Sequence, residues 1–448
     1  MELPNLVKWN CRIWLNGQLE RLKRGRHNVD HYIKRIADEE LARHLETFGA
    51  VLIEGPKWCG KTTTAMRYAR SSLLLADPTN DFEARTRAEV DPLLAITGET
   101  PRLIDEWQEV PKLWDAVRFE CDRRGGKSGQ YIMTGSATPK DAAKPMHSGA
   151  GRISRLRMDT MTLFELGVSS GVVSLRGLTS GNAYRGALGS LSTPRIAELV
   201  VRGGWPSVVG LSTERAALVA RQYIDVIAEE DISQVDNVRR DPEKVRALIR
   251  SLARNESTLA SLKTVTADLG GEVTRQTAAT YLSVLSRLHF IDEVPAWNPA
   301  MRSPVVLRSA KKRHFIDSSL AAAALGASIE SLCGDIKTLG LLFESLVLHD
   351  LGVYARAAGA SLYHYHDMDD LEADAIVAKS DGSWVAIEIK LGAAQIDDAS
   401  DNLARLESKM VSAGNRPPAA KCVIIGFGAP AYVTDRGIQV IPVDTLGV

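Results

Sequence analysis

The chain has 448 residues, with 55 Lys and Arg against 55 Asp and Glu, so its formal net charge is zero. Hydrophobic residues make up 45% and charged residues 25%, the balance of an ordinary globular protein. The length predicts roughly two to four domains. The neutral balance excludes a uniformly basic nucleic-acid coat protein and an acidic, solvated tail protein.

The cysteines indicate a reducing compartment. They are five in number, scattered, and form no C-x-x-C pair. This distribution excludes a zinc ribbon and a secreted disulfide framework. The sequence also has no apolar run of 18 residues. We therefore expect a cytoplasmic protein that does not span a membrane.

The first 45 residues are polar and basic. Residues 1–35 hold eight Lys and Arg against three Asp and Glu. The pattern predicts a helical, basic lead-in, with a solvated helix and a phosphate-contacting arm as the two interpretations.

An α/β pattern follows in residues 46–200. Short apolar runs at 50–53, 73–75, 102–104 and 131–133 predict buried strands, and residues 62–69 predict a helix after the first. Alternation of this kind favours a parallel, layered sheet. Residues 166–200 are rich in Gly, Ser and Thr, which predicts a loop or insertion.

A phosphate loop lies between the first strand and the helix. The segment GPKWCGKT at 55–62 matches G-x-x-x-x-G-K-[ST] without a gap. Backbone N–H groups there would face phosphate oxygens at a helix N-terminus. Lys61 would reach the β- and γ-phosphates and Thr62 would hold Mg²⁺, which predicts ATP as the ligand. The expected nucleotide contacts are Gly55, Pro56, Lys57, Trp58, Cys59, Gly60, Lys61, Thr62 and Thr63.

Other strand ends supply the remaining groups of an ATPase site. Asp105 would orient Mg²⁺, and Glu106 is the candidate base for the attacking water. Thr134 or Ser136 would sense the γ-phosphate from the same sheet edge. Arg152 is the first candidate, before Arg155, for an arginine that stabilises the transition state in cis or from a neighbouring subunit.

Residues 201–241 predict a helical lid, and residues 242–312 predict a winged helix-turn-helix. Its recognition helix would begin after Thr274, with Arg275, Gln276 and Thr277 in the first exposed turn, and 289–291 and 305–307 would form the wing strands. Residues 301–314 add five basic residues and no acid, namely Arg302, Arg308, Lys311, Lys312 and Arg313. The pattern favours DNA as a partner, although winged helices also dock proteins.

Residues 313–448 predict a second α/β domain. A long helix over 339–354 precedes strands at 362–365, 373–378 and 384–389; a helix at 397–411 and strands at 422–425 and 438–442 follow.

The ordered motifs resemble a bacterial and archaeal family that joins an AAA-type ATPase domain to a C-terminal domain of unknown function. The resemblance rests on the phosphate loop, the LIDE and TGSA strands, GRISRLRMDTMTLFELG, Arg202–Pro206, Arg313–Asp317 and the final EIK, and covers roughly residues 45–445. It implies an ATP-dependent protein whose C-terminal part is restriction-endonuclease-like.

The C-terminal carboxylates look like the PD-(D/E)xK nuclease core. There Asp374, Glu388 and Lys390 would be catalytic, and Glu344 would join Asp374 and Glu388 as metal ligands. Carboxylate oxygens suit Mg²⁺, with Mn²⁺ as the alternative. Ala373 departs from the usual Pro before the Asp.

Three functions remain open from the sequence. The first is an ATPase that acts on DNA and carries a metal-dependent nuclease domain. The second is an ATP-controlled binding or signalling protein whose nuclease-like domain is inert. The third is an ATPase that acts on a protein partner. Homo-oligomerisation is also left open, because an arginine supplied in trans would require it.

Overall fold

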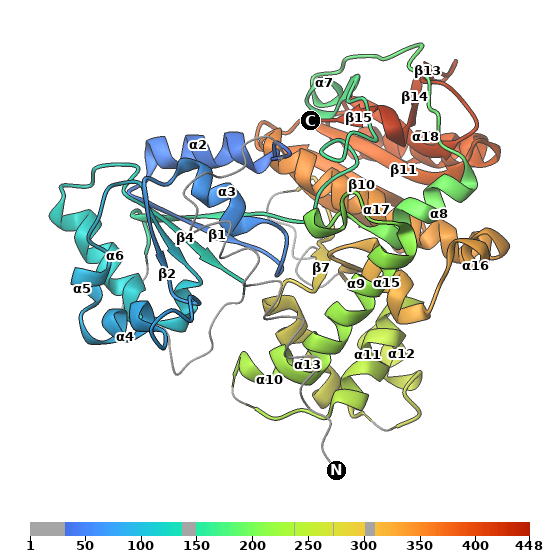
Figure 1. Cartoon of the computed structure of the whole chain (residues 1–448). Coiled ribbons are helices and arrows are strands. Elements are labelled where there is room, and N and C mark those ends of the chain that lie inside the picture. The colour runs from blue at the N-terminus through green and yellow to red at the C-terminus, as the bar shows by residue number, and fades with distance from the viewer. Residues whose placement is uncertain (1–31, 137–148, 237, 272, 301–309) are drawn as a thin grey trace.

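The computed structural model describes residues 32–136, 149–236, 238–271, 273–300 and 310–448. An N-terminal sheet with its helices lies on one side of the molecule, and a C-terminal sheet lies on the other (Figure 1). A group of helices, α9 to α13, lies below the C-terminal sheet in the same view. This mixed α/β architecture confirms the predicted fold class.

The N-terminal sheet has five parallel strands in the order β2-β3-β4-β1-β5. The four predicted strands are confirmed within two residues at each end. The strands are β1 (Ala50–Glu54), β2 (Ser71–Leu74), β3 (Arg102–Asp105), β4 (Tyr131–Gly135) and β5 (Ile153–Arg157).

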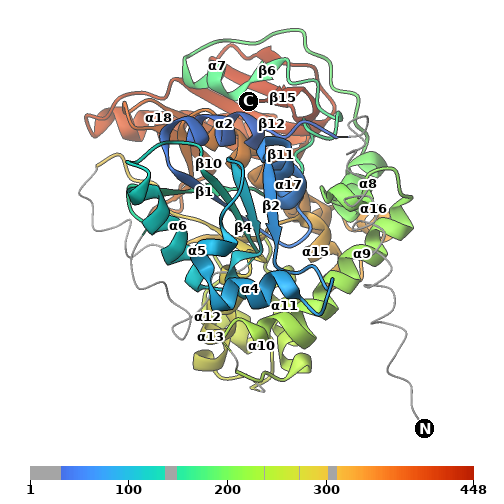
Figure 2. The same cartoon turned by 60° about the vertical axis from the view of Figure 1, so that its left-hand side comes forward.

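Helices cover both faces of this sheet (Figure 2). One face packs against α2 (Ala37–Thr47) and α3 (Lys61–Tyr68), where Leu41 and Ala65 meet Val51, Ile53 and Ile132. The other face is covered by α4 (Glu83–Val90), α5 (Pro92–Ala95) and α6 (Lys112–Arg123). Alternate residues of a buried strand face opposite layers, which explains why the central strands β1, β3 and β4 each carry a run of consecutive buried apolar residues.

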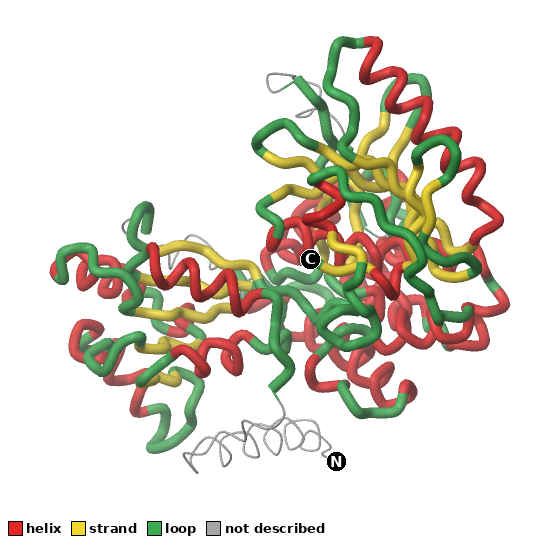
Figure 3. Tube along the Cα trace, turned by 90° about the horizontal axis from the view of Figure 1, so that it is seen from above, coloured by secondary structure: helices red, strands yellow, loops and turns green. Residues whose placement is uncertain are grey.

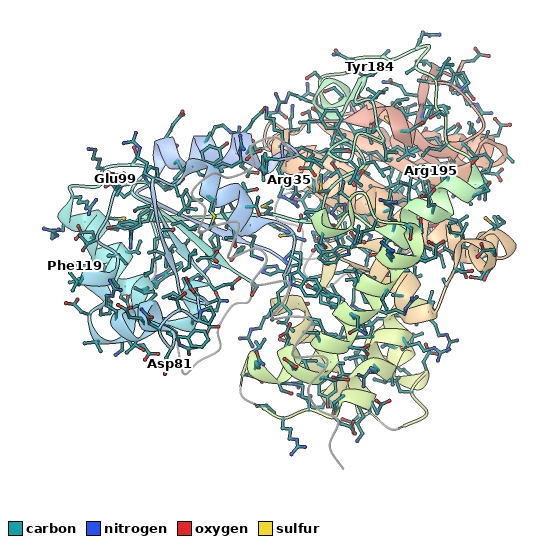
Figure 4. The ribbon with its side chains drawn as sticks, viewed as in Figure 1. Arg35, Asp81, Glu99, Phe119, Tyr184 and Arg195 are labelled. Atoms are coloured by element: carbon teal, nitrogen blue, oxygen red, sulfur yellow. The ribbon has the colours of Figure 1, made fainter. Side chains whose placement is uncertain are left out.

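The loop predicted over 166–200 is wrong in part. It contains β6 (Val173–Ser174), α7 (Leu175–Thr179) and the start of α8 (Thr193–Arg202). In α8, Ile196, Leu199 and Val200 fall at helical spacing and are buried. The segment lies against the C-terminal sheet: β6 pairs with β15 (Leu446–Gly447), and the backbone N–H of Tyr184 donates to Gln439. Figure 4 shows Tyr184 beside that sheet.

Helices form in the segments for which the sequence predicts a lid and a winged helix. They are α9 (Thr213–Val226), a π-helical turn η5 (Ile227–Asp231), α10 (Ile232–Gln234), α11 (Pro242–Arg254), α12 (Leu262–Ala267) and α13 (Arg275–Arg287). The Thr274 side chain accepts a hydrogen bond from the backbone N–H of Thr277 and caps α13, as its position predicts.

The wing differs from the prediction. β7 (Ile291–Val294) pairs antiparallel with β8 (Lys312–Phe315). The predicted second strand at 305–307 lies outside the described residues.

The C-terminal sheet is mixed and has the order β13-β14-β12-β11-β10-β9. Figure 3 shows its strands in yellow with helices in red beside them. Its helix α17 (Ile336–Ala357) packs on one face and α18 (Ile396–Ser412) on the other. Two shorter helices precede α17: α15 (Ser318–Leu325) and α16 (Ile329–Gly334). The strands are β9 (Ala360–His366), β10 (Glu372–Lys379), β11 (Trp384–Gly392), β12 (Ala420–Phe427), β13 (Tyr432–Val433) and β14 (Ile438–Pro442).

Buried polar contacts join the N-terminal sheet to the rest of the chain. Arg157, the last residue of β5, makes two hydrogen bonds to Asp292 of β7, at 2.7 and 3.1 Å. From α17, Arg356 forms an ion pair with Asp159, and Asp350 accepts a hydrogen bond of 3.0 Å from the backbone N–H of Leu163. None of the helices in the described ranges combines the length and apolar character that crossing a lipid bilayer requires.

Candidate ATP site and C-terminal acidic centre

The phosphate loop follows β1 directly and enters α3, as its sequence predicts. Two of its glycines are needed for steric reasons. A Cβ atom at Gly55 would lie 1.9 Å from the carbonyl oxygen of Met158. Gly60, the residue before α3, has a φ of 101°, in the left-handed region that favours glycine. These positions let the backbone curl around the N-terminus of α3.

The first turn of α3 brings Lys61 and Thr62 to the carboxyl end of the sheet. Lys61 is buried, and its Nζ donates to the carbonyl oxygens of Gly55 and Pro56, at 2.9 and 2.7 Å. The Thr62 hydroxyl donates to Oδ1 of Asp105 at 2.7 Å. The sheet therefore brings together the ammonium group, hydroxyl and carboxylate that the sequence assigns to a nucleotide site.

Thr134 of β4 connects Asp105, the last residue of β3, with Glu106, which follows it. Its hydroxyl donates to Oδ1 of Asp105 at 2.6 Å and accepts from the backbone N–H of Glu106 at 3.1 Å. Burial, followed by the neighbouring Glu106 carboxylate, raises the pKa of Asp105 above its ordinary value. A cation beside Asp105 would favour its charged form.

Glu106 is held apart from Asp105 by its backbone. Its φ of 55° and ψ of 51° place it in the left-handed region. Its carboxylate accepts hydrogen bonds from Gln108 and from the hydroxyl of Ser136, the latter at 3.2 Å. The two contacts fix one carboxylate oxygen, as a base that orients water requires. Sequence reasoning did not find Gln108, because a glutamine two residues after an acid carries no recognisable spacing.

The donor groups fit Mg²⁺, the metal that a P-loop fold implies. Mg²⁺ prefers oxygen ligands and usually keeps several waters. The Thr62 hydroxyl and the Asp105 carboxylate are oxygen donors that already contact each other. These two residues would hold the ion, which would neutralise phosphate charge when bound.

Several side chains of the loop contact the surrounding protein and stabilise the conformation of the loop. Cys59 is fully buried, and its thiol donates to the carbonyl oxygen of Met158 at 3.3 Å, so only its backbone can face a phosphate. Lys57 pairs at 2.6 Å with Asp231, a buried residue of η5. Trp58 makes an edge-to-face contact with Tyr223 of α9. Thr63 is exposed on α3.

A buried arginine that the sequence did not single out supports the loop from outside. Arg35 donates to the carbonyl oxygen of Cys59 at 2.7 Å and pairs with Glu165 at 2.9 Å. It lies between the N-terminal sheet and the C-terminal half in Figure 4.

The structure corrects the expectation that Arg152 acts at the ATP site of its own chain. Arg152 precedes β5, and its carbonyl oxygen accepts a hydrogen bond from the N–H of Ala50, at the start of β1. It thus lies at the edge of the sheet opposite the phosphate loop, about 20 Å along the strand direction from Gly55. Its side chain pairs with Asp122 at 2.8 Å. Arg155, the second candidate, pairs at 2.9 Å with Glu54, the residue before the loop.

Asp374, Glu388 and Lys390 meet in the C-terminal sheet as their spacing predicts. Lys390 Nζ lies 2.6 Å from Oε2 of Glu388 and 3.2 Å from Oδ2 of Asp374. The same Asp374 oxygen accepts a hydrogen bond of 2.8 Å from the backbone N–H of Ile389. Asn402 of α18 donates to Glu388 at 2.6 Å. Asp374 and Glu388 are both buried.

The predicted metal triad of Glu344, Asp374 and Glu388 does not form. Glu344 comes from α17 on one face of the sheet, whereas Glu388 is held by α18 on the other. Lys312 of β8 contacts Glu344 at 2.7 Å and Asp374 at 3.5 Å. Among the residues that the structure describes, no three His, Cys, Asp or Glu side chains are grouped closely enough to hold a metal ion. The acids therefore do not fit Mg²⁺ or Mn²⁺ in this arrangement.

The pKa shifts agree with a centre balanced by lysines. Burial, followed by the nearby Asp374 carboxylate, raises the pKa of both Glu344 and Glu388. Burial acts in the same direction on Asp374, but the ammonium groups of Lys312 and Lys390 outweigh it and lower the pKa of Asp374.

Lys312 also corrects the predicted basic wing. Its side chain is 8% exposed within the acidic centre, so it does not face a DNA backbone. The adjacent Lys311 and Arg313 both pair with Glu293. By contrast, Arg275 and Gln276 are exposed at the start of α13, as predicted. The exposed positive surface is thus smaller than the sequence total suggests.

Three family models match successive parts of the chain. Residues 47–167 match an AAA domain, residues 193–331 match a domain of unknown function (DUF8612), and residues 339–446 match another (DUF4143). The chain is 27% identical over 365 residues to the uncharacterized proteins Rv2008c of Mycobacterium tuberculosis and Mb2031c of Mycobacterium bovis, which covers 80% of this chain and 74% of each relative.

Solved structures show weaker similarity. The Walker-type ATPase PABY2304 of Pyrococcus abyssi aligns with a TM-score of 0.39 and 12% identity, over 66% of this chain and 97% of that one. The RuvB Holliday junction branch migration motor of Thermotoga maritima aligns with a TM-score of 0.28 and 19% identity, over 60% and 92%. The match to the AAA family model, together with the phosphate loop and its partner acids, identifies residues 47–167 as an AAA-type P-loop ATPase domain.

Proposed function

We propose that the chain hydrolyses ATP at the carboxyl edge of its N-terminal sheet. Lys61 would contact the β- and γ-phosphates, Thr62 and Asp105 would hold Mg²⁺, and Glu106 would orient the attacking water. The observation that carries the proposal is the contact set of Thr62, Asp105 and Thr134, which joins the first turn of α3 to the ends of β3 and β4 around one carboxylate.

Glu106→Gln tests the assignment of the base. An amide cannot accept a proton, so we expect ATP turnover to fall at least 100-fold while ATP affinity changes less than threefold. Steady-state hydrolysis and fluorescent-nucleotide binding measure the two quantities. Glu109→Gln is the matched control, because Glu109 lies in the same turn and pairs with Arg85 on the surface. Hydrolysis by Glu106→Gln at the wild-type rate would exclude Glu106 as the base.

An arginine at the γ-phosphate would have to come from elsewhere than Arg152 of the same chain. We infer that Arg152, which is half-exposed, could serve only a site on a neighbouring copy. A mixture of Arg152→Ala chains and Glu106→Gln chains tests this inference, because each copy would supply what the other lacks. Recovery of turnover above the sum of the separate variants supports it, and the absence of recovery contradicts it.

We propose that DNA contacts the first turn of α13. The exposed Arg275 and Gln276 at a helix N-terminus have the side chains that read base edges and phosphates. Arg275→Ala should weaken binding of a duplex oligonucleotide at least fivefold, and Arg215→Ala, an exposed arginine on α9, is the matched control. Binding that depends steeply on salt and falls in Arg275→Ala supports the proposal. Equal binding by both variants would instead favour a protein partner.

A second observation favours an inert nuclease-like domain. Lys312 and Lys390 compensate the carboxylates that a metal would need. We propose that this domain serves ATP-controlled binding and does not cleave DNA. Plasmid incubated with the protein and Mg²⁺ or Mn²⁺ should remain intact. Cleavage that is lost in both Asp374→Ala and Lys390→Ala would overturn the proposal and establish the nuclease function.

A further inference from the structure

The acidic centre contains a cation that the chain itself supplies. Lys312 is buried, and its ammonium group lies 2.7 Å from Oε1 of Glu344 and 3.5 Å from Oδ1 of Asp374. The two carboxylates are thus bridged from α17 to β10 by one positive charge. A divalent metal ion between them would require the same position, because it would need the same two oxygens.

Lys312 reaches the centre from outside the C-terminal sheet. It belongs to β8, which pairs with β7, and Val294 is its partner in the ladder. Strand alternation explains its isolation from its neighbours: Lys311 and Arg313 both pair with Glu293, whereas Lys312 is buried in the centre. The β7–β8 ribbon therefore delivers one lysine to the acids.

The ribbon is fixed beside the centre by main-chain contacts. Trp297 N–H donates to the carbonyl oxygen of His364 at 2.7 Å, and His364 N–H donates to that of Pro295 at 3.0 Å. Phe315, at the end of β8, donates its N–H to Glu256 at 2.9 Å. These contacts hold Lys312 beside the two carboxylates.

We propose that Lys312 is a built-in cation of the acidic centre and that its ammonium group excludes divalent metal ions from Asp374 and Glu344. The proposal rests on the proposed inertness of this domain and supplies its cause. Lys390 does not have this role, because its ammonium group pairs with Asp374 and Glu388, whereas the ammonium group that pairs with Glu344 is that of Lys312. Lys312 is the residue that pairs with Glu344 of α17.

Manganese binding to the full chain tests the proposal. Free Mn²⁺ is measured by electron paramagnetic resonance, and only the binding that Asp374→Asn removes is attributed to this centre. Wild type and Asp374→Asn should bind Mn²⁺ equally. Lys312→Met should gain a Mn²⁺ site with an affinity at least tenfold higher than any that wild type shows at this centre. This gain should disappear in Lys312→Met/Asp374→Asn. Lys311→Met is the matched control and Lys312→Arg retains the charge; neither should gain the site.

Each outcome supports or overturns the proposed role of Lys312. Binding by wild type that exceeds Asp374→Asn shows that Lys312 does not exclude the metal, and this comparison remains valid if Lys312→Met fails to fold. A folded Lys312→Met without new binding also overturns the proposal. Failure of the inert-domain proposal appears separately, as Asp374-dependent plasmid cleavage. An intact plasmid with no gain in Lys312→Met refutes only the role of Lys312.

Discussion

The carboxyl group of Glu256 lies at the junction of β8 and α17, two of the elements that build the acidic centre. Glu256 is 2% exposed. Its Oε1 accepts hydrogen bonds from the Phe315 N–H at 2.9 Å and from the Ser345 hydroxyl at 2.6 Å. Burial outweighs these two bonds and raises the pKa of Glu256 to about 8. The folded chain therefore holds this side chain protonated at neutral pH.

The shift has a definite consequence for stability. The unfolded chain releases this proton near the ordinary pKa of a glutamate, about 4.3, whereas the folded chain keeps it until about pH 8. Its contribution is therefore fully present below pH 4 and is lost as pH rises through the window between the two values. At about 1.36 kcal/mol per pKa unit, the loss between pH 6 and pH 8 is on the order of 2 kcal/mol.

Glu256→Gln removes the titration and keeps the acceptor. The amide oxygen can accept both hydrogen bonds without a charged form to bury. We expect the unfolding free energy of wild type to fall by about 2 kcal/mol from pH 6 to pH 8 relative to Glu256→Gln. Urea unfolding at pH 6, 7 and 8 measures the difference, with Glu46→Gln at an exposed position of α2 as the matched control. Parallel curves for wild type and Glu256→Gln would refute the reasoning.

Three further predictions concern the ATP site. Thr134→Val removes the hydroxyl bonded to Asp105, so turnover should fall about tenfold or more with ATP affinity within threefold; unchanged steady-state turnover would contradict its role. Lys57→Met leaves Asp231 buried without its lysine, so the unfolding free energy should fall by about 3 kcal/mol. Adding Asp231→Asn should recover most of this loss. A double variant that is no more stable in urea than Lys57→Met would contradict the prediction. Burial raises the pKa of Cys59, so a thiol reagent should modify it only after denaturation; rapid labelling of native protein, located by peptide mass spectrometry, would show the loop to be open.

The ATP site was largely readable from the sequence because its chemistry is local. The loop from Gly55 to Thr62 is contiguous in sequence. The strands that position Asp105 and Thr134 can be predicted from their apolar composition. In parallel strands, residues at the carboxyl ends meet at one edge whatever their distance along the chain. Arg152 could not be placed in this way, because it directly precedes β5 and therefore lies at the other edge of the sheet.

The acidic centre was only half readable. The spacing of Glu388 and Lys390 fixed their common face, and the structure confirms their contact. Nothing local marked Lys312 as different from Lys311, because adjacent lysines in a basic run look alike until strand register assigns them to opposite faces. Which face becomes buried depends on α17 and β10, which are distant in sequence.

Helix α17 makes the boundaries between the matched families poor places to divide the molecule. Its first half supplies Glu344 to the acidic centre, and its second half supplies Asp350 and Arg356 to the segment that follows β5. A chain cut ahead of α17 would leave the buried Asp159 without one of its arginines. The ATPase and C-terminal parts therefore cannot be exchanged as independent cassettes. A homologous chimera would have to carry α17 and its partners across together, so these charges should change in concert during evolution.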